Sequence, residues 1–298
     1  MKDQTPLSER IITRGIQITG YSSVLFVVLI LYFLLSQGAP ALLEAPLKSL
    51  AGIRWYPIEN YFGIIPLILG SLVVTIGAAV IAIPFGVGTA IFISEVAPQW
   101  LKEILNPLVE ILAGFPSVML GFLGILVVSP SLRRLFDLPT GLTALAGSLL
   151  LAGIAIPTIV SISEDALNTV PKAYREASWA IGATQWQTIW GVTLPAARSG
   201  VLTAVILGIG RSIGETMTVM MVTGNAPVLP IHLNSFISPI RTMTATIASE
   251  MGEVATGSTH YHVLFLIGII LFLISLVVNV TASAIVFRQP KRAERILS

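Results

Sequence analysis

Arg211 and Glu215 are the residues of this sequence best suited to handle an anion. They stand four positions apart inside an otherwise apolar or small stretch from Ser199 to Thr223. A charge at the centre of a bilayer-spanning helix costs roughly 2.5–3.5 kcal/mol on insertion scales, so it persists mainly where it lines a polar pathway or has a partner. On one continuous helix, this spacing places both side chains on one face. We therefore expect a substrate pathway at Arg211 and Glu215.

An arginine at this position suits a compact oxyanion such as phosphate. Its guanidinium keeps its charge and offers a planar fork of donors that can bind phosphate through two hydrogen bonds. Glu215 would neutralise Arg211 between transport events. Arg before Glu is the weaker order for a helical pair, so an arriving anion could displace the carboxylate. The alternative is a permanent ion pair, to each other or to a partner subunit, because buried ion pairs can be purely structural.

Residues beside this pair are candidates for the same pathway. Gly210 and Gly214 have the spacing that lets membrane helices pack closely, and they could also leave room for a substrate. The Thr216 and Thr218 hydroxyls either donate to the substrate or bond to their own helix backbone, and we favour the backbone. Glu110, inside the third apolar stretch, faces either the same pathway or the membrane interface.

The elements that position these residues must be membrane helices. The 298 residues are 54% hydrophobic and 11% charged, with a mean hydropathy of +0.88, whereas a soluble domain has about a quarter of charged residues. The absence of cysteine excludes disulfides, thiolate metal sites and cysteine nucleophiles. A span needs about 20 residues. Six apolar stretches are long enough: 16–36, 64–93, 105–128, 141–163, 197–223 and 263–287. We therefore expect an all-α, polytopic membrane protein with six transmembrane helices.

Six spans place both termini on one side of the membrane. If that side is the cytoplasm, the inside segments hold eleven of the 17 Lys and Arg residues and the outside loops hold five. The positive-inside rule then predicts cytoplasmic termini. The first stretch could instead be a signal peptide cleaved near Ala39-Pro-Ala41, but its apolar run exceeds the usual length of about 7–15 residues. The basic C-terminal tail suits contact with anionic membrane lipid: Arg288, Lys291, Arg292 and Arg295.

The loop between the fourth and fifth stretches carries the most specific motif. It resembles the EAA motif of ABC-importer permeases, which is Glu-Ala-Ala, three residues, Gly, nine residues, then Ile-x-Leu-Pro. Five positions match at that spacing: Glu176, Ala177, Gly182, Leu194 and Pro195. Ser178 and Val192 are mild departures. The resemblance implies that residues 171–195 dock on a cytoplasmic ATPase and transmit its closure.

The motif loop should contain a short helix from Glu176 to about Ala183, followed by a bend and a return to the membrane. It has little apolar surface of its own apart from Trp179, Trp186 and Trp190. The alternative is an ordinary surface loop whose aromatic residues anchor it at the membrane interface.

Three further segments are similar to the phosphate-specific (Pst) permeases: Ala113 to Val118, Ile156 to Leu167, and Gly210 to Met217 followed by Val222 to Asn225. The third segment is similar to the PstC-type subunit. The PstA-type subunit usually has Ala-Pro after Gly-Glu-Thr, where this chain has Met217-Thr218. The resemblance runs from about Phe62 to Phe287 and implies the type I ABC importer permease (MetI-like) fold.

The resemblance implies a permease subunit of an ATP-driven inorganic phosphate importer in the bacterial plasma (inner) membrane. The implied partners are a second, PstA-type permease, a PstB-type ATPase homodimer and an extracytoplasmic PstS-type phosphate-binding protein, with no nucleic acid. A P-loop requires Gly-Lys, and none of the five lysines follows a glycine. We therefore expect no enzymatic activity and no cofactor in this chain, with ATP and Mg²⁺ bound by the partner ATPase.

We divide the chain into three parts. Residues 1–62 comprise an N-terminal cytoplasmic segment, the first transmembrane helix and an outer loop. Residues 63–288 form the permease core with five transmembrane helices. Residues 289–298 form a cytoplasmic tail.

Other functions remain as alternatives to phosphate import. A permease for molybdate or sulfate would carry the same coupling motif. A membrane scaffold could sense phosphate without transporting it. An intramembrane hydrolase would need Glu215 with His260 or His262, but the sequence has neither an HExxH motif nor a serine elbow.

Two groups of polar residues have simpler explanations. His260 and His262, with Glu250 and Glu253 before them, do not form a complete metal-ligand set. We expect them in an exposed outer loop that touches the binding protein. Glu95 ends the second apolar stretch, where a carboxylate can remain hydrated.

Overall fold

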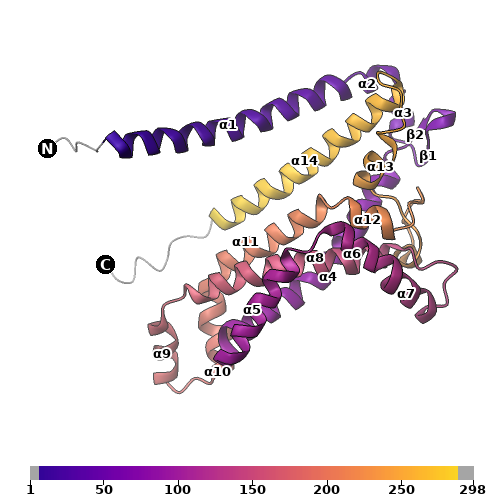
Figure 1. Cartoon of the computed structure of the whole chain (residues 1–298). Helices are drawn as coiled ribbons and strands as arrows, with labels where there is room; N and C mark the ends of the chain where they lie inside the picture. Colours follow the sequence, from indigo (N-terminus) through magenta and orange to yellow (C-terminus); the bar gives the residue numbers. More distant parts are fainter. Residues whose placement is uncertain (1–6, 288–298) are drawn as a thin grey trace.

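The computed structural model describes residues 7–287, and this part of the chain is mostly helical (Figure 1). It contains six helical segments long and apolar enough to cross a membrane: Ile12–Glu44, Ile65–Val96, Ser117–Leu135, Ala144–Asn168, Gln185–Ile213 and Thr259–Thr281. The predicted all-α fold with six spans is confirmed. The predicted tail at 289–298, with the basic residues expected to touch lipid, lies outside the described residues.

Three of the spans contain a π-helical turn. In chain order they are α4 (Ile65–Ile91) with the π-helical turn η2 (Phe92–Val96), α6 (Ser117–Leu123) with the π turn η3 (Gly124–Val128) and α7 (Ser129–Leu135), and α10 (Gln185–Thr188) with the π turn η4 (Ile189–Thr193) and α11 (Leu194–Ile213). The first span runs along α1 (Leu7–Gly38) and into α2 (Ala41–Glu44), and the two remaining spans lie within α8 (Ala144–Asn168) and α14 (Thr259–Phe287).

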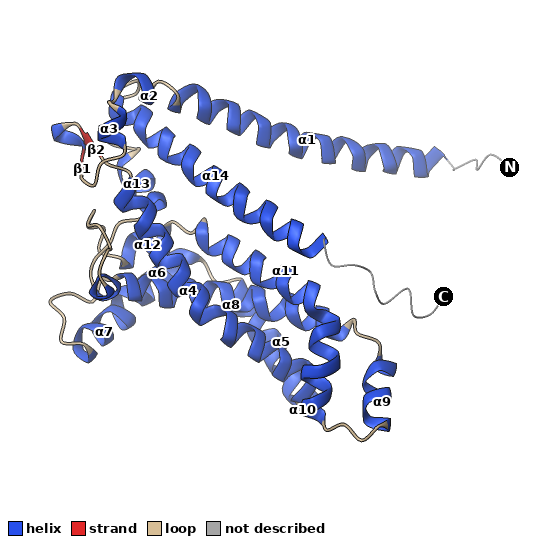
Figure 2. Ribbon diagram, turned by 180° about the vertical axis from the view of Figure 1, so that it is seen from behind, coloured by secondary structure: helices blue, strands red, loops and turns tan. Residues whose placement is uncertain are grey.

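Shorter elements gather at the two ends of the bundle. The α9 end carries α9 (Lys172–Ala180) and α10. The opposite end, here called the hairpin end, carries the antiparallel strands β1 (Trp55–Tyr56) and β2 (Tyr61–Phe62) (Figures 1 and 2). The remaining short elements are α2 (Ala41–Glu44), α3 (Leu47–Leu50), η1 (Pro57–Glu59), α5 (Gln99–Ala113), α12 (Met217–Val222), η5 (Leu233–Ile237) and α13 (Met243–Glu250).

Helix α8 is the centre of the bundle and packs against both α4 and α11. Small residues make this close approach possible, as expected where helices pack in lipid. A Cβ added at Gly86 of α4 would lie 2.7 Å from Ile159 of α8, and one added at Gly208 of α11 would lie 2.5 Å from the same side chain. Ile159 therefore packs against both glycines, and this packing holds α8 between α4 and α11.

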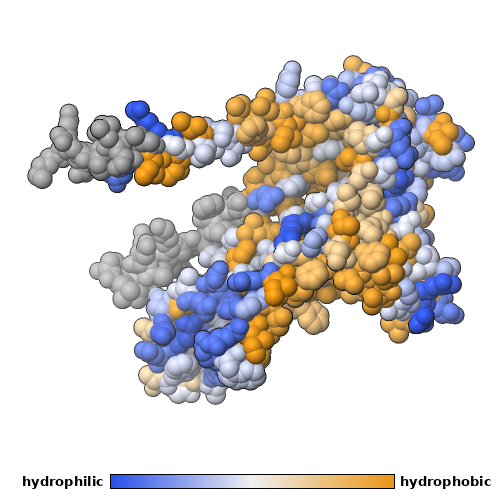
Figure 3. All heavy atoms as spheres, in the orientation of Figure 1, coloured by the Kyte–Doolittle hydropathy of each residue, from blue (hydrophilic) through white to orange (hydrophobic). Residues whose placement is uncertain are grey.

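Helix α1 lies outside this core and packs along α14 (Figures 1 and 2). The rings of Phe33 and Phe265 meet edge to face at 5.6 Å, and a Cβ at Gly38 would lie 2.6 Å from Ile269. The other faces of α1 expose large apolar side chains. Hydrophobic residues cover much of α1 and α14, while hydrophilic residues gather near the α9 end (Figure 3). This distribution is typical of a lipid-facing surface.

Two stretches predicted as continuous spans are broken. The helix expected over 105–128 ends with α5 at Ala113 and restarts with α6 at Ser117. Pro116 explains this break, because proline disfavours the helical conformation in the residue before it. The helix expected over 197–223 ends with α11 at Ile213 and restarts with α12 at Met217. The predictions of continuity are wrong, and both breaks bear on the polar site.

Candidate functional site

The two helix breaks lie against each other. α12 packs on α6, and the Thr218 hydroxyl at the start of α12 donates to the Ser117 carbonyl at the start of α6 over 2.8 Å. On the other side of the breaks, Arg211 in the last turn of α11 reaches the Ala113 carbonyl at the end of α5. The structure therefore brings Arg211 to the junction of two interrupted helices.

Arg211 is bound by two neutral acceptors. Its Nη1 donates to the Thr158 hydroxyl of α8 over 3.3 Å, and its Nη2 donates to the Ala113 carbonyl over 3.2 Å. The last carbonyls of a helix lack intrahelical partners and carry partial negative charge. Arg211 satisfies one such carbonyl and leaves other donors of its guanidinium available, because arginine has five N–H groups. Its side chain is exposed within this single chain.

Glu215 does not pair with Arg211. Among the side chains that the structure describes, the arginine–carboxylate pairs within 4.0 Å are Arg175–Glu95 and Arg241–Glu250. The Glu215 carboxylate instead accepts a hydrogen bond of 3.3 Å from the backbone N–H of Thr218 and lies 3.3 Å from the Thr218 hydroxyl oxygen. The prediction of one shared helix face is wrong because α11 ends before Glu215, and in this conformation the carboxylate caps α12.

The remaining predicted pathway residues leave space beside Arg211. A Cβ added at Gly210 would approach only Asn279, at 3.8 Å, and one at Gly214 would approach only the Arg211 carbonyl, at 3.9 Å. Among the described residues, neither glycine therefore makes the close helix contact that their spacing could provide. The Thr216 hydroxyl bonds to a backbone carbonyl, that of Gly214, over 3.3 Å, but this carbonyl lies in the break between α11 and α12. The Thr218 hydroxyl bonds to the Ser117 carbonyl of α6, so the predicted bond to its own helix is wrong for Thr218.

Glu110 lies on a separate cavity of about 230 Å³ between α5 and α8. Its other polar lining residues are Asn106, Ser161, Glu164, Asp165 and Asn168. Asn106 donates to Glu164 over 3.1 Å. Arg211 does not line this cavity.

The motif loop forms a helical hairpin at the α9 end. The helix expected from Glu176 to about Ala183 begins earlier, at Lys172 after Pro171, and ends at Ala180. Gly182 has φ +86°, a left-handed conformation that glycine adopts without steric cost. The predicted boundaries were therefore shifted by several residues, and the motif glycine is the turn that ends α9.

The other motif residues divide between the surface and the hairpin interior. Glu176 and Ala177 are exposed on α9. Ser178 is buried, and its hydroxyl lies 3.0 Å from the Thr188 hydroxyl of α10. This contact joins α9 to α10 and gives a structural reason for serine at the third motif position. Leu194 and Pro195 open α11 directly after the π turn η4. Because proline has no N–H to donate, the regular helical bonding is interrupted there.

Aromatic residues of the motif loop are exposed. Trp179 is 52% exposed, and Trp186 and Trp190 are each 60% exposed. Ile181, in the turn, is 86% exposed. Concentrated apolar exposure of this kind marks an interaction surface.

Glu95 is a site residue that the sequence prediction missed. It was expected to be hydrated, but its side chain is only 8% exposed and forms a two-pronged ion pair with Arg175 of α9. Arg175 Nη2 lies 2.6 Å from Oε1, and its Nε lies 3.1 Å from Oε2. The prediction of hydration is wrong because α9 folds back over the end of the second span. No motif places Glu95 near residues 80 positions later in the chain.

The hairpin end has its own carboxylate cluster around Glu250 of α13. Its carboxylate accepts from Trp55 Nε1 over 3.1 Å and pairs with Arg241 and His260 at 2.8 Å each. Burial by itself raises the pKa of Glu250. Hydrogen bonds from His260 and Trp55 and the charges of Arg241 and His260 outweigh burial, so the net shift of the pKa is downward. His262 pairs separately with Glu44 at 2.9 Å, so His260 and His262 each have their own carboxylate. Both lie in the first turn of α14 and are partly buried, so the prediction of an exposed loop is wrong for these two residues.

Comparisons with known proteins agree with this architecture. Residues 82–292 match the family described as "Binding-protein-dependent transport system inner membrane component". The chain is 42% identical over 233 residues to the probable ABC transporter permease protein YqgH of Bacillus subtilis (strain 168), which covers 78% of this chain and 74% of that protein. It is 35% identical over 259 residues to the phosphate transport system permease protein PstC of Xylella fastidiosa (strain 9a5c), which covers 80% and 78%.

Two solved structures share the fold at low sequence identity. An inward-facing structure of the MetNI methionine ABC transporter has a TM-score of 0.60 at 19% identity and covers 78% of this chain and 98% of that chain. A bacterial alginate ABC transporter, in complex with a periplasmic protein bound to an alginate pentasaccharide, has a TM-score of 0.58 at 15% identity and covers 92% and 94%. The expected type I importer permease fold is confirmed.

Proposed function

This chain belongs to the family of binding-protein-dependent transport system inner membrane components, and from that premise we propose that it is the permease subunit of an ATP-driven inorganic phosphate importer. Relatives named as phosphate transport system permease protein PstC, matching 80% and 81% of its length, support this substrate. The chain forms the translocation pathway, and a separate ATPase supplies the energy.

The observation that carries the phosphate assignment is Arg211 at the junction of the two broken helices. Its guanidinium bonds to Thr158 and to a backbone carbonyl, and the space beside Gly210 is open. A phosphate oxyanion can replace or add to these neutral acceptors through charge-assisted hydrogen bonds, which are about twice as strong as neutral ones. Binding at Arg211 is transient, because tight binding would hinder release, and high affinity belongs to a separate binding protein.

Glu215 neutralises Arg211 at another stage of the cycle. The two residues are separated by the break between Ile213 and Met217, where the chain lacks the constraint of a continuous helix. A change of conformation at this break exchanges the Thr218 contact of Glu215 for Arg211. Phosphate and the carboxylate thus alternate as partners of one guanidinium.

The α9 end faces the cytoplasm and meets the ATPase. The N-terminal end of α1 and the C-terminal end of α14 lie toward the same side as α9 (Figures 1 and 2). The excess of basic residues in the segments on that side supports this orientation. The exposed surface around Glu176, Ala177 and the three tryptophans is the docking face. The assembly contains a PstA-type permease, a PstB-type ATPase dimer and a PstS-type binding protein that meets the hairpin end.

The test is uptake of labelled phosphate by vesicles that hold this chain with its candidate partners and ATP inside. We expect ATP-dependent uptake in the wild type and its loss in Arg211→Ala, with assembly intact. Arg211→Lys keeps the charge without the fork and should retain only a small part of the uptake. Arg198→Ala, an exposed arginine of the same helix, is the matched control and should transport normally.

Competing anions separate phosphate from its alternatives. Excess unlabelled phosphate should abolish the uptake of label, and molybdate and sulfate should not. Wild-type vesicles that take up molybdate or sulfate but not phosphate would overturn the substrate assignment. Uptake that survives in Arg211→Ala would leave an importer in which Arg211 serves only to stabilise the helix ends.

A further inference from the structure

Helix α9 makes few buried contacts with the rest of the chain. It has nine residues, and the one that the structure buries is Ser178, which contacts α10. A force applied to this helix by a docked subunit would reach the membrane helices only through specific contacts. The question is therefore which side chains connect α9 to the spans.

Arg175 is the side chain of α9 that makes this connection. Besides its two bonds to Glu95 in η2, it donates to the Val170 carbonyl over 2.8 Å and to the Leu167 carbonyl over 3.0 Å. Leu167 lies in the last turn of α8, where carbonyls lack helical partners. One guanidinium therefore joins α9 to the ends of both α4–η2 and α8. Because its fork is planar and rigid, it sets direction as well as distance.

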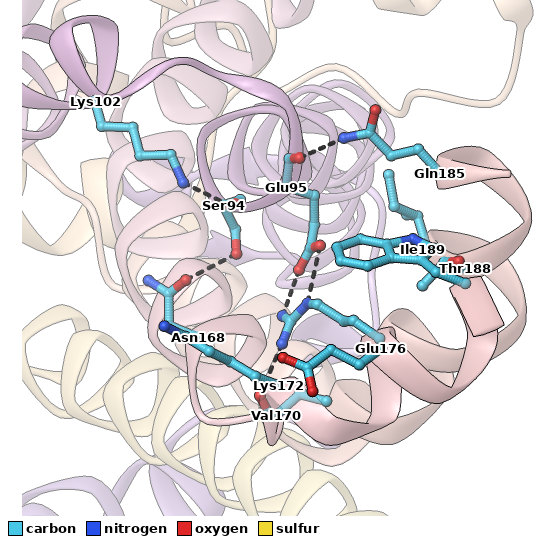
Figure 4. Close-up of a pocket in the computed structure, with 12 residues that line it drawn as sticks. Ser94, Glu95, Lys102, Asn168, Val170, Lys172, Glu176, Gln185, Thr188 and Ile189 are labelled. Atoms are coloured by element: carbon cyan, nitrogen blue, oxygen red, sulfur yellow. Dashed lines mark hydrogen bonds and ion pairs between the residues drawn. The ribbon is translucent and has the colours of Figure 1, made fainter.

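On the membrane side, Glu95 contacts two separate elements of the motif loop. Its carboxylate holds α9, and its backbone carbonyl accepts from Gln185 of α10 over 2.7 Å. The neighbouring Ser94 carbonyl accepts from Lys102 of α5 over 2.7 Å, and the Ser94 hydroxyl donates to Asn168 at the end of α8 over 2.9 Å. Figure 4 shows Gln185, Lys102 and Asn168 converging on these two residues from separate elements.

The pair is shielded from water, with side chains 8% and 14% exposed. Shielding strengthens the attraction and penalises separation of the charges. The far end of the connection also leads to the polar site, since α8 carries both Leu167 and Thr158, the partner of Arg211. A continuous helix thus runs from the ion pair to the guanidinium that meets the anion.

We propose that the Glu95–Arg175 ion pair is the joint through which movement of α9 is transmitted to α4 and α8, so that both are positioning residues for coupling ATP hydrolysis to transport. The proposal rests on the proposed function. It assigns a role to an arginine and a glutamate that touch neither the transported anion nor ATP. Loss of the joint lets α9 move without moving the spans.

The test compares Glu95→Gln, Arg175→Gln and the double variant in the reconstituted complex with its ATPase and binding protein. Phosphate transported per ATP hydrolysed should fall about tenfold in each single variant, and the double variant should be no worse, as expected for residues in one hydrogen-bonded network. Glu103→Gln is the matched control, because Glu103 is an exposed carboxylate of α5 that contacts Gln99. A transported-to-hydrolysed ratio equal to wild type in both single variants would overturn the proposal.

A distance measurement separates transmission from simple stability. The chain has no cysteine, so spin labels at Ala173→Cys on α9 and Phe85→Cys on α4 require no removal of native cysteines from this subunit. Between the nucleotide-free and ATP-trapped complexes, their separation should stay constant with Glu95 present and change in Glu95→Gln. The same change in spin-label separation with Glu95 and with Glu95→Gln would contradict the proposed role of the ion pair.

Two further outcomes are distinguishable. If Glu95→Gln fails to assemble, Arg175→Lys, which keeps the charge but not the fork, replaces it and should give an intermediate ratio. A ratio equal to wild type in that variant would overturn the joint. Absence of ATP-driven phosphate uptake by the wild-type complex would overturn the proposed function instead. The spin-label distances would still show whether the Glu95–Arg175 ion pair transmits the movement of α9.

Discussion

Arg175 and Arg211 are the same side chain in opposite situations. Arg175 has a shielded carboxylate partner on two prongs and two backbone carbonyls. Arg211 has one hydroxyl and one carbonyl, both neutral and both at 3.2–3.3 Å. Arg175 has four of its five N–H groups bonded and fixes elements to one another. An arginine with only neutral acceptors can exchange them for an anion, so the difference in partners matches the two roles that we propose, coupling for Arg175 and transport for Arg211.

The largest expected effect is on stability, and it should differ between these arginines. Arg175→Ala leaves Glu95 as an unpaired, shielded charge, and breaking such a pair costs about 3–5 kcal/mol. Arg211→Ala removes two bonds to neutral groups and should cost about 1–3 kcal/mol less than Arg175→Ala, because the acceptors left behind are uncharged. Thermal unfolding of the purified complex measures both. Equal losses of stability would remove the distinction drawn between the two regions.

The next effect compares Gly208 and Gly210, two glycines of α11 that are separated by one residue. Gly208→Leu should destabilise the bundle by about 1–3 kcal/mol, since overpacking forces neighbours apart and Ile159 occupies the space. Gly210→Leu has open space and should fold normally but lower phosphate uptake by crowding Arg211. Unfolding temperature and uptake together check this. Normal uptake in Gly210→Leu would place the anion path elsewhere.

A smaller effect should come from the Thr158 hydroxyl. Thr158→Val removes the acceptor of Arg211 Nη1 without changing the shape of the side chain. A hydrogen bond to a charged group contributes about 1.5–3 kcal/mol, and part of it should be recovered by bonding to the substrate. We expect half-maximal uptake at a severalfold different phosphate concentration with assembly unchanged. An identical concentration dependence would show that Thr158 does not position Arg211.

The smallest effect concerns Glu250, the carboxylate partner of Arg241 at the hairpin end. Its pKa is lowered in the folded chain, so its contribution to stability is present above the ordinary value of 4.5 and is lost as pH falls through the lowered folded value. Acid unfolding curves of wild type and Glu250→Gln should converge below pH 4.5. Curves that stay parallel through this range would contradict the lowered pKa.

Part of this structure could be predicted from local sequence alone. Six spans follow from apolar length, because only a closed system of backbone hydrogen bonds can cross lipid. The short helix of the motif loop was also predicted, but Gly182 lies inside the predicted range to about Ala183, and its positive φ gives the physical reason why α9 ends earlier. The break at Pro116 could also have been predicted, since proline restricts the conformation of the residue before it. The sequence analysis nevertheless expected one helix over 105–128.

Only the tertiary structure decided the partners of the charged residues. The spacing of Arg211 and Glu215 indicated a helical pair, but the end of α11 at Ile213 separates them, and Arg211 instead bonds to residues 53 and 98 positions away. Glu95 and Arg175, 80 positions apart, gave no local sign of their ion pair. The sequence by itself determined which segments are apolar enough to enter the membrane and which loop resembles the coupling motif, because these depend on composition and local spacing. The tertiary fold determined which charge meets which, because that depends on where helices end and how they pack.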